Sequence, residues 1–326
     1  MSVASSIVLP RLRLSSKKVI STQIYDFLRK LIIETTIKPG TLLSENGLSE
    51  HFHVSRQPVR EALMGLSYEG LLSVLPQRGS VVERISVSRL QQTVFVRTAI
   101  EKECVLNYKK LDKRARHQCL TQLEKIIVQQ HQCDLKAAES AAIDAAAAAA
   151  SAATASGLTA SSVVPAADDV FDELERDHEQ ETEHGNEVLG GLLPRERRDS
   201  RDSKDKDLRA TYFRLDDSFH EHLCGISGGG MAWNTIQLIK GQMDRIRFLT
   251  FNLVTPTEVL TEEHRQILEY LKAEDYERCL NSLEAHLSTI NESHKPVIRE
   301  YSEWFTPESV AHLKEEDLQG KPVKEL

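Results

Sequence analysis

The stretch LSEHFHVSRQPVREALMGLSYEGLL, Leu48–Leu72, joins a short polar turn to a strongly amphipathic segment. Apolar side chains in that segment recur with the spacing of one helix face, at Val59, Ala62, Leu63 and Leu66. Ser55 precedes the segment as a helix cap, and Gly70 follows it as a stop. The stretch therefore predicts a helix from Ser55 to about Tyr68 that buries one face and exposes the other.

The sequence on either side supplies further elements. An apolar stripe predicts a first helix over residues 21–35, and Ser44 caps a short second helix over residues 45–52. After Gly70, residues 72–82 are rich in β-favouring side chains around a Pro/Gly turn, so they predict two strands joined as a hairpin. Helix, helix, turn, helix and hairpin in this order are the layout of a winged helix-turn-helix.

The outer face of the third predicted helix carries groups suited to nucleic acid. Arg56 and Arg60 lie one turn apart on it, and an arginine fork suits guanine edges or phosphate oxygens. Backbone amides at the helix start suit a phosphate, and a glycine at the hairpin tip lets the backbone approach a groove. The residues predicted to contact DNA on these grounds are Ser55, Arg56, Gln57, Arg60, Arg78 and Gly79.

The alternative is a helical hairpin with solvated arginines. That structure is enough to explain any single Arg-x-x-x-Arg pair. The cap, the turn and the hairpin together favour the DNA-binding architecture.

The distribution of charge along the chain agrees with DNA binding by the N-terminal part. The chain has a net charge of −8, yet residues 1–89 hold 12 Lys and Arg against 7 Asp and Glu. The excess acid lies further along, above all in residues 168–187, so the N-terminal part can bind phosphate locally.

The remainder of the chain has helical patterning with one interruption. Residues 137–207 are of low complexity, with few large apolar side chains, and predict a mostly disordered insertion, although alanine favours helix in part of it. The predicted organisation is a flexible arm at 1–18, a winged helix-turn-helix at 19–85, a helical bundle at 86–136 and 208–300, the insertion at 137–207 and a tail at 301–326. The predicted fold class is mainly α.

Composition points to a cytoplasmic protein that does not enter a membrane. The chain contains no apolar run of the length that a membrane span needs, and its N-terminus lacks the basic start of a signal peptide. The cysteines are odd in number and form no C-x-x-C pair, which favours reduced thiols; they are Cys104, Cys119, Cys133, Cys224 and Cys279.

Three helices of the predicted bundle carry polar side chains where apolar ones are expected. Asp216 and His220 lie on one apolar stripe, and His264 and His286 each lie on another. A buried Asp or His needs a partner, and a single metal ion would serve all four. One oxygen and three nitrogens suit zinc or a similar divalent ion, and an open coordination position would accept a carboxylate.

Other interpretations of these four residues remain open. They are also compatible with unrelated core histidines held by hydrogen bonds, in a regulator whose bundle only dimerises or binds an apolar effector. A metal-dependent enzyme fused to a DNA-binding domain is a further alternative. The sequence contains no H-E-x-x-H motif and no evident general base beside these residues, so we expect no enzymatic activity.

The segment GTLLSENGLSEHFHVSRQPVREALMGLSYEGLLSVLPQRGSVV, Gly40–Val82, resembles the DNA-binding domain of the GntR family of bacterial regulators. The resemblance implies a DNA-binding transcriptional regulator, more often a repressor than an activator. It also implies DNA contacts from Asn46, Arg56, Arg60 and Gly79. Asn46 stands where the family often has arginine, and Met64 stands where a basic residue is common.

The helical part resembles the FCD sensor domain of the FadR-type subfamily, through VRTAIE (Val96–Glu101), LDDSFHEHL, EEHRQIL and LEAHL. The resemblance implies a divalent metal, with zinc expected, and a small carboxylate or sugar acid as effector. It assigns the metal to Asp216, His220, His264 and His286. Candidate arginines for clamping a carboxylate are Arg97, Arg245 and Arg247. We expect a homodimer that reads palindromic half-sites about one helical turn apart.

Overall fold

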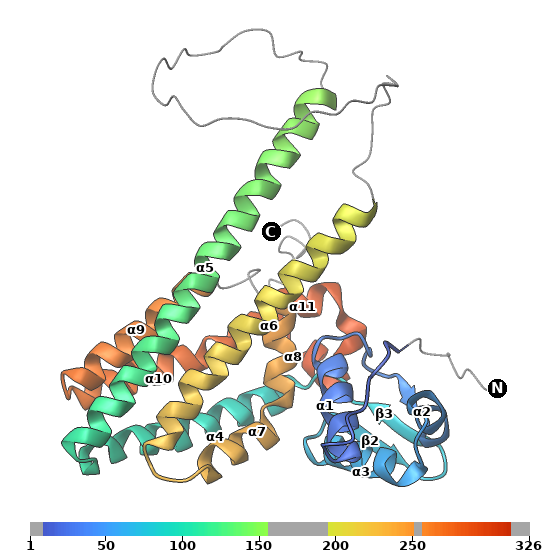
Figure 1. Ribbon diagram of the computed structural model, residues 1–326, viewed down its shortest axis with the longest axis horizontal. Helices are drawn as coiled ribbons and strands as arrows, with labels where there is room; N and C mark the ends of the chain where they lie inside the picture. The colour runs from blue at the N-terminus through green and yellow to red at the C-terminus, as the bar shows by residue number, and fades with distance from the viewer. Residues whose placement is uncertain (1–8, 156–194, 251–255, 314–326) are drawn as a thin grey trace, which may run out of the picture. The chain divides into compact units, whose positions relative to one another are not determined.

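The computed structural model describes residues 9–155, 195–250 and 256–313. These residues are mainly helical, with one small sheet near the N-terminus (Figure 1). The predicted fold class, a winged helix-turn-helix followed by an all-helical bundle, is confirmed. The chain divides into two compact units, Met1–Asp134 together with Arg209–Leu326, and Leu135–Leu208. The winged helix-turn-helix and the candidate metal residues all belong to the first unit.

The winged helix-turn-helix has three helices and a three-stranded antiparallel sheet of order β1-β3-β2. Its apolar stripes meet in one core, in which Ile24, Leu28, Val59 and Leu66 are fully buried. Ser44 caps α2 by accepting a hydrogen bond from the backbone N–H of Gly47 at 3.4 Å. The elements are α1 (Ile20–Ile33), β1 (Leu42–Leu43), α2 (Glu45–Phe52), α3 (Arg56–Tyr68), β2 (Leu72–Leu75) and β3 (Gly79–Val82).

The bundle follows directly after the sheet. It begins with α4 (Val87–Leu106) and the short η1 (Asn107–Lys110). Apolar faces of α5, α6, α9 and α10 form its main core, with Leu123, Phe219, Ile267 and Leu283 fully buried. The remaining elements are α5 (Lys113–Ala155), α6 (Arg195–Gly225), α7 (Met231–Ile239), α8 (Gly241–Thr250), α9 (Thr257–Lys272), α10 (Tyr276–Ser288), α11 (Ile290–Glu300), η2 (Ser302–Trp304) and α12 (Pro307–Ala311).

Two segments that the sequence predicts to be flexible or mostly disordered contain defined structure. The predicted arm is in contact with the winged helix-turn-helix from Leu9 onward, because Leu9 is buried in its core and Leu12 and Leu14 pack against it. The predicted insertion is helical over part of its length, since α5 continues to Ala155 and α6 begins at Arg195. Residues 156–194, which contain the acidic run at 168–187, lie outside the described residues.

The described part of the predicted tail at 301–326 returns to the linker between the winged helix-turn-helix and the bundle. Ile85 in that linker donates its N–H to the carbonyl of Trp304 at 2.8 Å and accepts from the N–H of Thr306 at 2.9 Å. Phe305 forms a parallel bridge with Ile85, and both side chains are buried in one apolar cluster. The tail therefore fixes the linker as an added short strand would.

Gly79 opens β3 with a φ of +109°. A Cβ at this position would lie 2.5 Å from the carbonyl oxygen of Leu43 in β1. We expect Gly79→Ala to lower the free energy of unfolding by roughly 1–3 kcal/mol, through backbone strain and the clash. Urea unfolding measures this. Gly228→Ala is the matched control, because Gly228 has a φ of +80° and open space around it. Equal losses of unfolding free energy in the two variants would contradict a clash with the Leu43 carbonyl.

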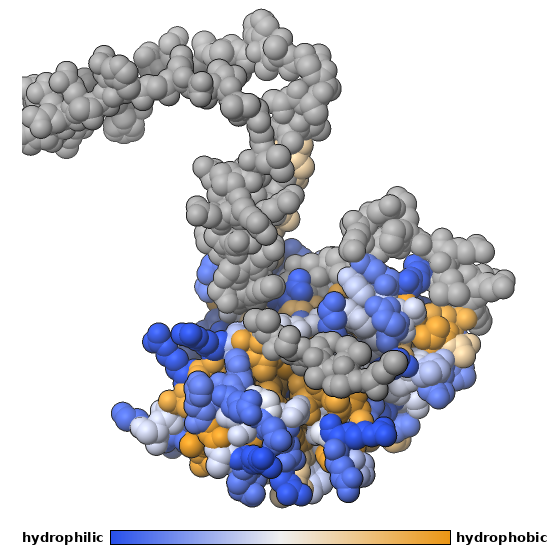
Figure 2. Space-filling model, turned by 90° about the vertical axis from the view of Figure 1, so that its right-hand side faces the viewer, coloured by the Kyte–Doolittle hydropathy of each residue, from blue (hydrophilic) through white to orange (hydrophobic). Residues whose placement is uncertain are grey.

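The surface of the winged helix-turn-helix is mixed in character. Figure 2 shows this side of the molecule, where hydrophobic residues lie among hydrophilic ones. Exposed large apolar residues here include Leu42, Met64, Tyr68 and Val74. Within the described part of the chain, no helix combines the length and the apolar character required to cross a membrane.

Candidate functional site

The predicted DNA-contacting residues gather on one domain and face solvent. Asn46, at the start of α2, and Arg56 and Arg60, on α3, are exposed. Among the described residues neither arginine forms an ion pair. Ser55 occupies the N-cap position of α3, and its side chain makes no capping hydrogen bond, so it does not compete for the helix amides. Gln57 donates to Glu61 at 2.9 Å.

The hairpin tip supplies the other two predicted contacts. Arg78 is exposed, and Gly79 is half-buried beside β1. From the sequence, glycine at position 79 was expected to let the backbone approach a DNA groove closely. The structure gives a different reason, because the Leu43 backbone already occupies the space that a side chain would need. A role in DNA contact remains a prediction for this residue.

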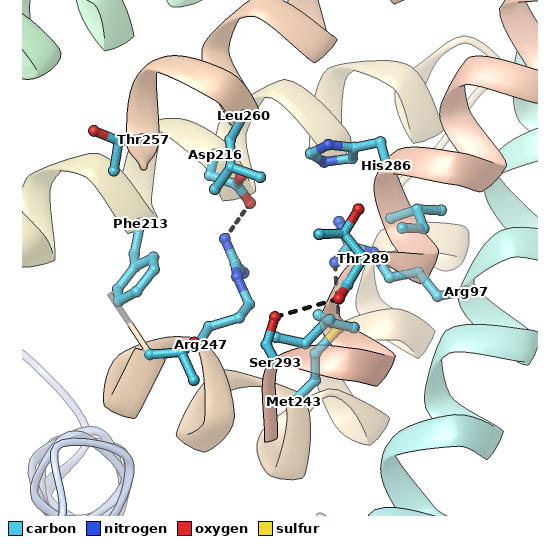
Figure 3. Close-up of a pocket in the computed structure, with 13 residues that line it drawn as sticks. Arg97, Phe213, Asp216, Met243, Arg247, Thr257, Leu260, His286, Thr289 and Ser293 are labelled. Atoms are coloured by element: carbon cyan, nitrogen blue, oxygen red, sulfur yellow. Dashed lines mark hydrogen bonds and ion pairs between the residues drawn. The ribbon is translucent and has the colours of Figure 1, made fainter. Parts of the chain in front are cut away.

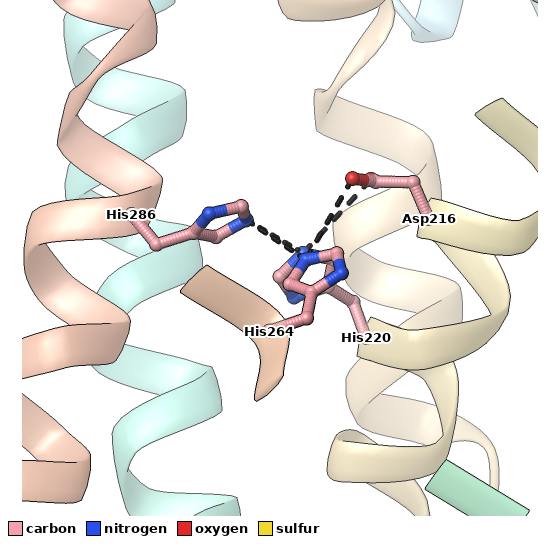
Figure 4. Close-up of side chains that lie close together, drawn as sticks. All are labelled: Asp216, His220, His264 and His286. Atoms are coloured by element: carbon pink, nitrogen blue, oxygen red, sulfur yellow. Dashed lines mark hydrogen bonds and ion pairs between the residues drawn. The ribbon is translucent and has the colours of Figure 1, made fainter. Parts of the chain in front are cut away.

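The four polar residues predicted to bind metal lie together in the bundle. Asp216 and His220 come from α6, His264 from α9 and His286 from α10, and all four side chains point toward one another (Figure 4). One ligand atom from each lies within 4.8 Å of the others. His264 and His220 are fully buried, and Asp216 and His286 are nearly so.

Each imidazole is oriented by an acceptor on its other nitrogen. The Nδ1 atom of His220 lies 2.7 Å from the Glu101 carboxylate, and that of His286 lies 2.7 Å from Glu263. The Nδ1 atom of His264 lies 3.0 Å from the amide oxygen of Gln130. A carboxylate or amide oxygen accepts, so each Nδ1 carries the proton and each Nε2 keeps its lone pair.

The three Nε2 lone pairs converge. The Nε2 of His286 lies 3.2 Å from that of His220 and 3.1 Å from that of His264. With both protons on Nδ1, such pairs are not hydrogen bonds and repel unless a cation lies between them. Zinc–nitrogen bonds of 2.0–2.1 Å in a tetrahedron would place neighbouring nitrogens about 3.3 Å apart, close to the observed separations.

Electrostatics keeps these groups in the protonation states that a metal needs. Burial, followed by the charge of Arg97, lowers the pKa of His220. Burial, followed by His286, lowers the pKa of His264 well below its usual range. Burial acts to raise the pKa of Asp216, but the positive charge of Arg247 outweighs it and holds that pKa far below normal. At neutral pH the imidazoles of His220 and His264 are therefore neutral and Asp216 is a carboxylate, which are the forms that bind a metal.

A small cavity of about 70 Å³ adjoins the cluster, with Asp216 and His286 in its wall (Figure 3). Arg97 and Arg247, two of the arginines predicted to clamp an acid, line it. The Nη2 atom of Arg97 is buried and has no hydrogen-bond partner among the described residues. The third, Arg245, lies elsewhere and donates from Nη1 to the carbonyl of Glu83 at 2.7 Å, so it is a contact to the winged-helix domain.

Sequence reasoning missed the residues that orient the histidines. Glu101 had a visible signal, since it lies four residues after Arg97 on the same helix and the two form a buried ion pair at 2.6 Å. Glu263 directly precedes His264 but serves His286 on the next helix. Gln130 lies on α5, and nothing in its local pattern marks it. Which histidine each of these residues orients is revealed only by the packing of separate helices.

We expect Glu263→Gln to weaken metal binding by about 10–100-fold, as is usual when the partner that orients a histidine ligand is changed. An amide is a poorer acceptor than a carboxylate, so the His286 imidazole becomes a weaker ligand. Competition titration with a zinc indicator measures the affinity. Glu262→Gln is the neighbouring control, because Glu262 pairs with Arg265 at the surface and is not part of the polar cluster. Equal affinities in the two variants would remove Glu263 from the site.

Comparison with known proteins agrees with both parts of this description. Residues 20–82 match the family of bacterial regulatory proteins named gntR, and residues 139–289 match the FCD domain. An HTH-type transcriptional regulator of Escherichia coli O6:H1, YdfH, is 30% identical over 289 residues, which are 89% of this chain and 95% of that protein. The chain belongs to the GntR family. It is a DNA-binding transcriptional regulator, in line with a family of regulators rather than enzymes.

Other GntR relatives support the same assignment. The transcriptional repressor RspR of Escherichia coli K12 is 29% identical over 91% of this chain and 98% of its own length. The sequence features HVSRQPVREA, PQRGS, LDDSFH and SEWF already suggest that likeness. A gluconate operon transcriptional repressor of Bacillus licheniformis is 35% identical over 31% of this chain and 40% of its own length.

Solved structures extend the likeness to the fold. The E. coli protein McbR/YncC has a TM-score of 0.51 at 17% identity, covering 85% of this chain and 95% of its own. At that identity the likeness concerns the fold alone. The FCD match includes all four residues of the polar cluster and begins within α5, in the region predicted as an insertion.

Proposed function

We propose that this GntR regulator is a repressor controlled by a small carboxylate or sugar acid that binds beside a divalent metal, with zinc favoured. The observation that carries the proposal is the convergence of three unprotonated Nε2 atoms and one carboxylate in a buried site. A cluster of lone pairs without a cation would be destabilising in a low-dielectric interior. Asp216, His220, His264 and His286 would hold the ion.

The adjoining cavity suits a small acid. When bound, the metal would supply a Lewis-acidic position for one carboxylate oxygen. Arg97 offers a buried and unpartnered Nη2 for the other oxygen, and Arg247 adds a second guanidinium. Thr289 and Ser293 line the same cavity and suit the hydroxyl groups of a sugar acid. One relative is named for the gluconate operon, and gluconate belongs to this chemical class.

The DNA-facing proposal rests on the exposed residues of the winged helix-turn-helix. Arg56 and Arg60 would read base edges from α3 in the major groove, and the α3 amides would hold a phosphate. Arg78 at the hairpin tip would contact the adjacent backbone. The full proposed set is Asn46, Ser55, Arg56, Gln57, Arg60, Arg78 and Gly79. Because the partner is double-stranded DNA, we place the protein in the cytoplasm.

A homodimer on a palindromic operator fits an apolar face shared by α4 and α7. Phe95 on α4 is 75% exposed, and Leu238 on α7 is 56% exposed. Val96 on α4 and Leu238 on α7 line one hollow, and Tyr68 and Glu69 of the winged-helix domain line it too. Exposed large apolar side chains on these two helices favour contact with a second copy of the chain.

We expect Phe95→Glu combined with Leu238→Glu to convert a dimer into a monomer, because it places four charges in a two-fold apolar interface. Light scattering after gel filtration measures the mass. Val128→Glu is the control, since Val128 is 57% exposed on α5, outside this face. A dimeric mass in the double variant would exclude the α4–α7 face.

The direct test is a thermal-shift series on the full chain with D-gluconate and other small acids, with zinc and after chelation. A ligand that binds the folded state raises the melting temperature by mass action. We expect an acid-dependent rise that requires zinc. Apolar side chains such as Met243, Leu260 and Ile290 also line the cavity, so an apolar effector without metal is the second candidate. Stabilisation by apolar compounds in the presence of chelator would favour it.

A further inference from the structure

A continuous chain of ion pairs leads away from Asp216. Arg247 on α8 pairs through Nη2 with Asp216. Its Nη1 atom lies 3.4 Å from Asp217 and 3.7 Å from Asp244. Lys240 bridges the same two acids, with Nζ 2.9 Å from Asp217 and 2.7 Å from Asp244. One arginine thus links a proposed metal ligand to a group of shared carboxylates.

The chain ends in the winged-helix domain. Asp244 accepts from Nη2 of Arg29 on α1 at 3.0 Å. The Nε of the same arginine donates to Glu69 at the end of α3 at 2.8 Å, and Tyr25 on α1 donates to the same carboxylate. Arg29 therefore ties α8 of the bundle to both α1 and the C-terminal end of α3. Since α1 and α3 share one core, a change at Arg29 acts on the helix that carries the DNA-facing arginines.

The members of this chain are buried enough to influence one another. Lys240 is 2% exposed and Asp244 is 8% exposed. Charges in such surroundings are screened weakly by water and salt. If Arg247 exchanges one carboxylate partner for another, the electrostatic attraction of Lys240 and Arg29 to the shared carboxylates therefore changes.

Space for that movement exists beside the chain. A cavity of about 460 Å³ is lined by Arg29, Asp217, Lys240, Asp244 and Arg247. Arg247 also lines the small cavity at the polar cluster, and its guanidinium lies 5.0 Å from the centre of the Phe213 ring, which lines both cavities. Arg247 and Phe213 together form the wall between the two cavities.

Asp216 is the residue for which Arg247 and a metal would compete. Its oxygens lie 3.8 and 3.9 Å from the Nε2 atoms of His264 and His220, which is further than the imidazole nitrogens lie from each other. A cation in the cluster would draw the carboxylate toward the imidazoles and repel the guanidinium. Arg247 retains acceptors on its other side, at Asp217 and Asp244.

We propose that this ion-pair chain transmits occupancy of the metal centre to the winged-helix domain, with Arg247 as the moving part. The inference rests on the proposed metal centre. With a metal held by Asp216 and the imidazoles, Arg247 would shift onto Asp217 and Asp244, where it would compete with Lys240 and Arg29. The ion pair between Asp244 and Arg29 would weaken as a result. Because Arg29 lies on α1, that helix would then be less restrained. Arg29, Lys240 and Asp244 are positioning residues in this scheme, since they touch neither DNA nor metal.

The test is amide hydrogen exchange on the full chain, with Zn²⁺ alone as the probe and zinc content measured on the same samples. In the wild type we expect zinc to speed exchange in α1 by about 2- to 30-fold, the range of a modest coupling between sites. Asp244→Asn should bind zinc normally and lose the α1 response. Arg29→Gln, at the partly exposed end of the chain, should lose the α1 response while α8 still responds.

Glu284→Gln is the matched control, because it removes an ion pair with Lys102 elsewhere in the bundle and should leave the response intact. Wild-type protein that binds zinc without any change in α1 overturns the relay. An unchanged α1 response in Asp244→Asn and Arg29→Gln overturns it as well. A wild type that binds no zinc refutes the metal centre itself, together with the relay, and the zinc measurement identifies that case.

Discussion

Replacing His264 by alanine should abolish tight zinc binding and the response to acids, while binding to DNA persists. His264 is fully buried and supplies one of three converging Nε2 atoms. Removing a direct ligand should cost more than the roughly 10–100-fold expected for an orienting partner. The remaining Asp216, His220 and His286 supply only three of the four ligands that favour zinc. Zinc content after dialysis and a competition titration measure the loss.

This variant needs a control for stability, because the His264 ring stacks on Phe219 with centroids 4.0 Å apart. His264→Gln, which keeps more of the buried volume, provides a second version of the same test. His222→Ala is the matched surface control, since His222 is an exposed histidine on α6 outside the cluster. Zinc retained at wild-type affinity in both His264 variants would show that the cluster is a set of core histidines and not a metal centre.

Replacing Arg56 and Arg60 together by alanine should remove specific DNA binding. Each arginine that contacts base edges is worth roughly 1–3 kcal/mol, so the pair is worth about 2–6 kcal/mol if the two effects add. Both side chains are exposed, so the fold should be unaffected. A binding site selected from random DNA with the wild type serves as the probe, and fluorescence anisotropy at one fixed salt concentration measures the affinity.

Arg265→Ala is the control for the loss of positive charge, because Arg265 lies on the surface of the bundle and pairs with Glu262. The single variant Arg60→Ala separates the two arginines, and we expect it to weaken specific binding by roughly 1–3 kcal/mol. An unchanged footprint in that variant would remove Arg60 from the reading face. Equal losses on specific and random DNA would indicate phosphate contact instead of base recognition.

Local patterns in the sequence were sufficient for the short helices. The predicted limits of α2 match the structure, because a serine cap and a three-residue turn bound that helix. The two-residue strand β1 was missed, since Leu42 and Leu43 are too few to show alternation. The packing of Leu9 and Phe305 was also missed, because it depends on residues distant in the chain.

In the candidate site, too, local sequence signals identified some residues, and residues that depend on distant contacts were missed. Asp216, His220, His264 and His286 were found because polar residues interrupt apolar stripes, which is a local signal. The effector role predicted for Arg245 was incompatible with that of Arg247, because positions two apart on a helix point to opposite sides. In the structure Arg247 lines the cavity and Arg245 faces Glu83. The partners Gln130 and Glu101 required knowledge of which helices pack together.

The hydrogen bonds that join the linker at Ile85 and Val87 to residues 304–309 have a consequence for biosynthesis. Ile85 is held by Trp304 and Thr306, and Val87 donates its N–H to Ser309, 222 residues later. At roughly 5–20 residues per second, a ribosome needs about 10–40 s to cover that distance. The winged-helix domain can fold soon after it emerges, but its joint to the helical bundle closes last. During translation the nascent chain therefore carries a DNA-binding domain before the bundle that we propose to regulate it is complete.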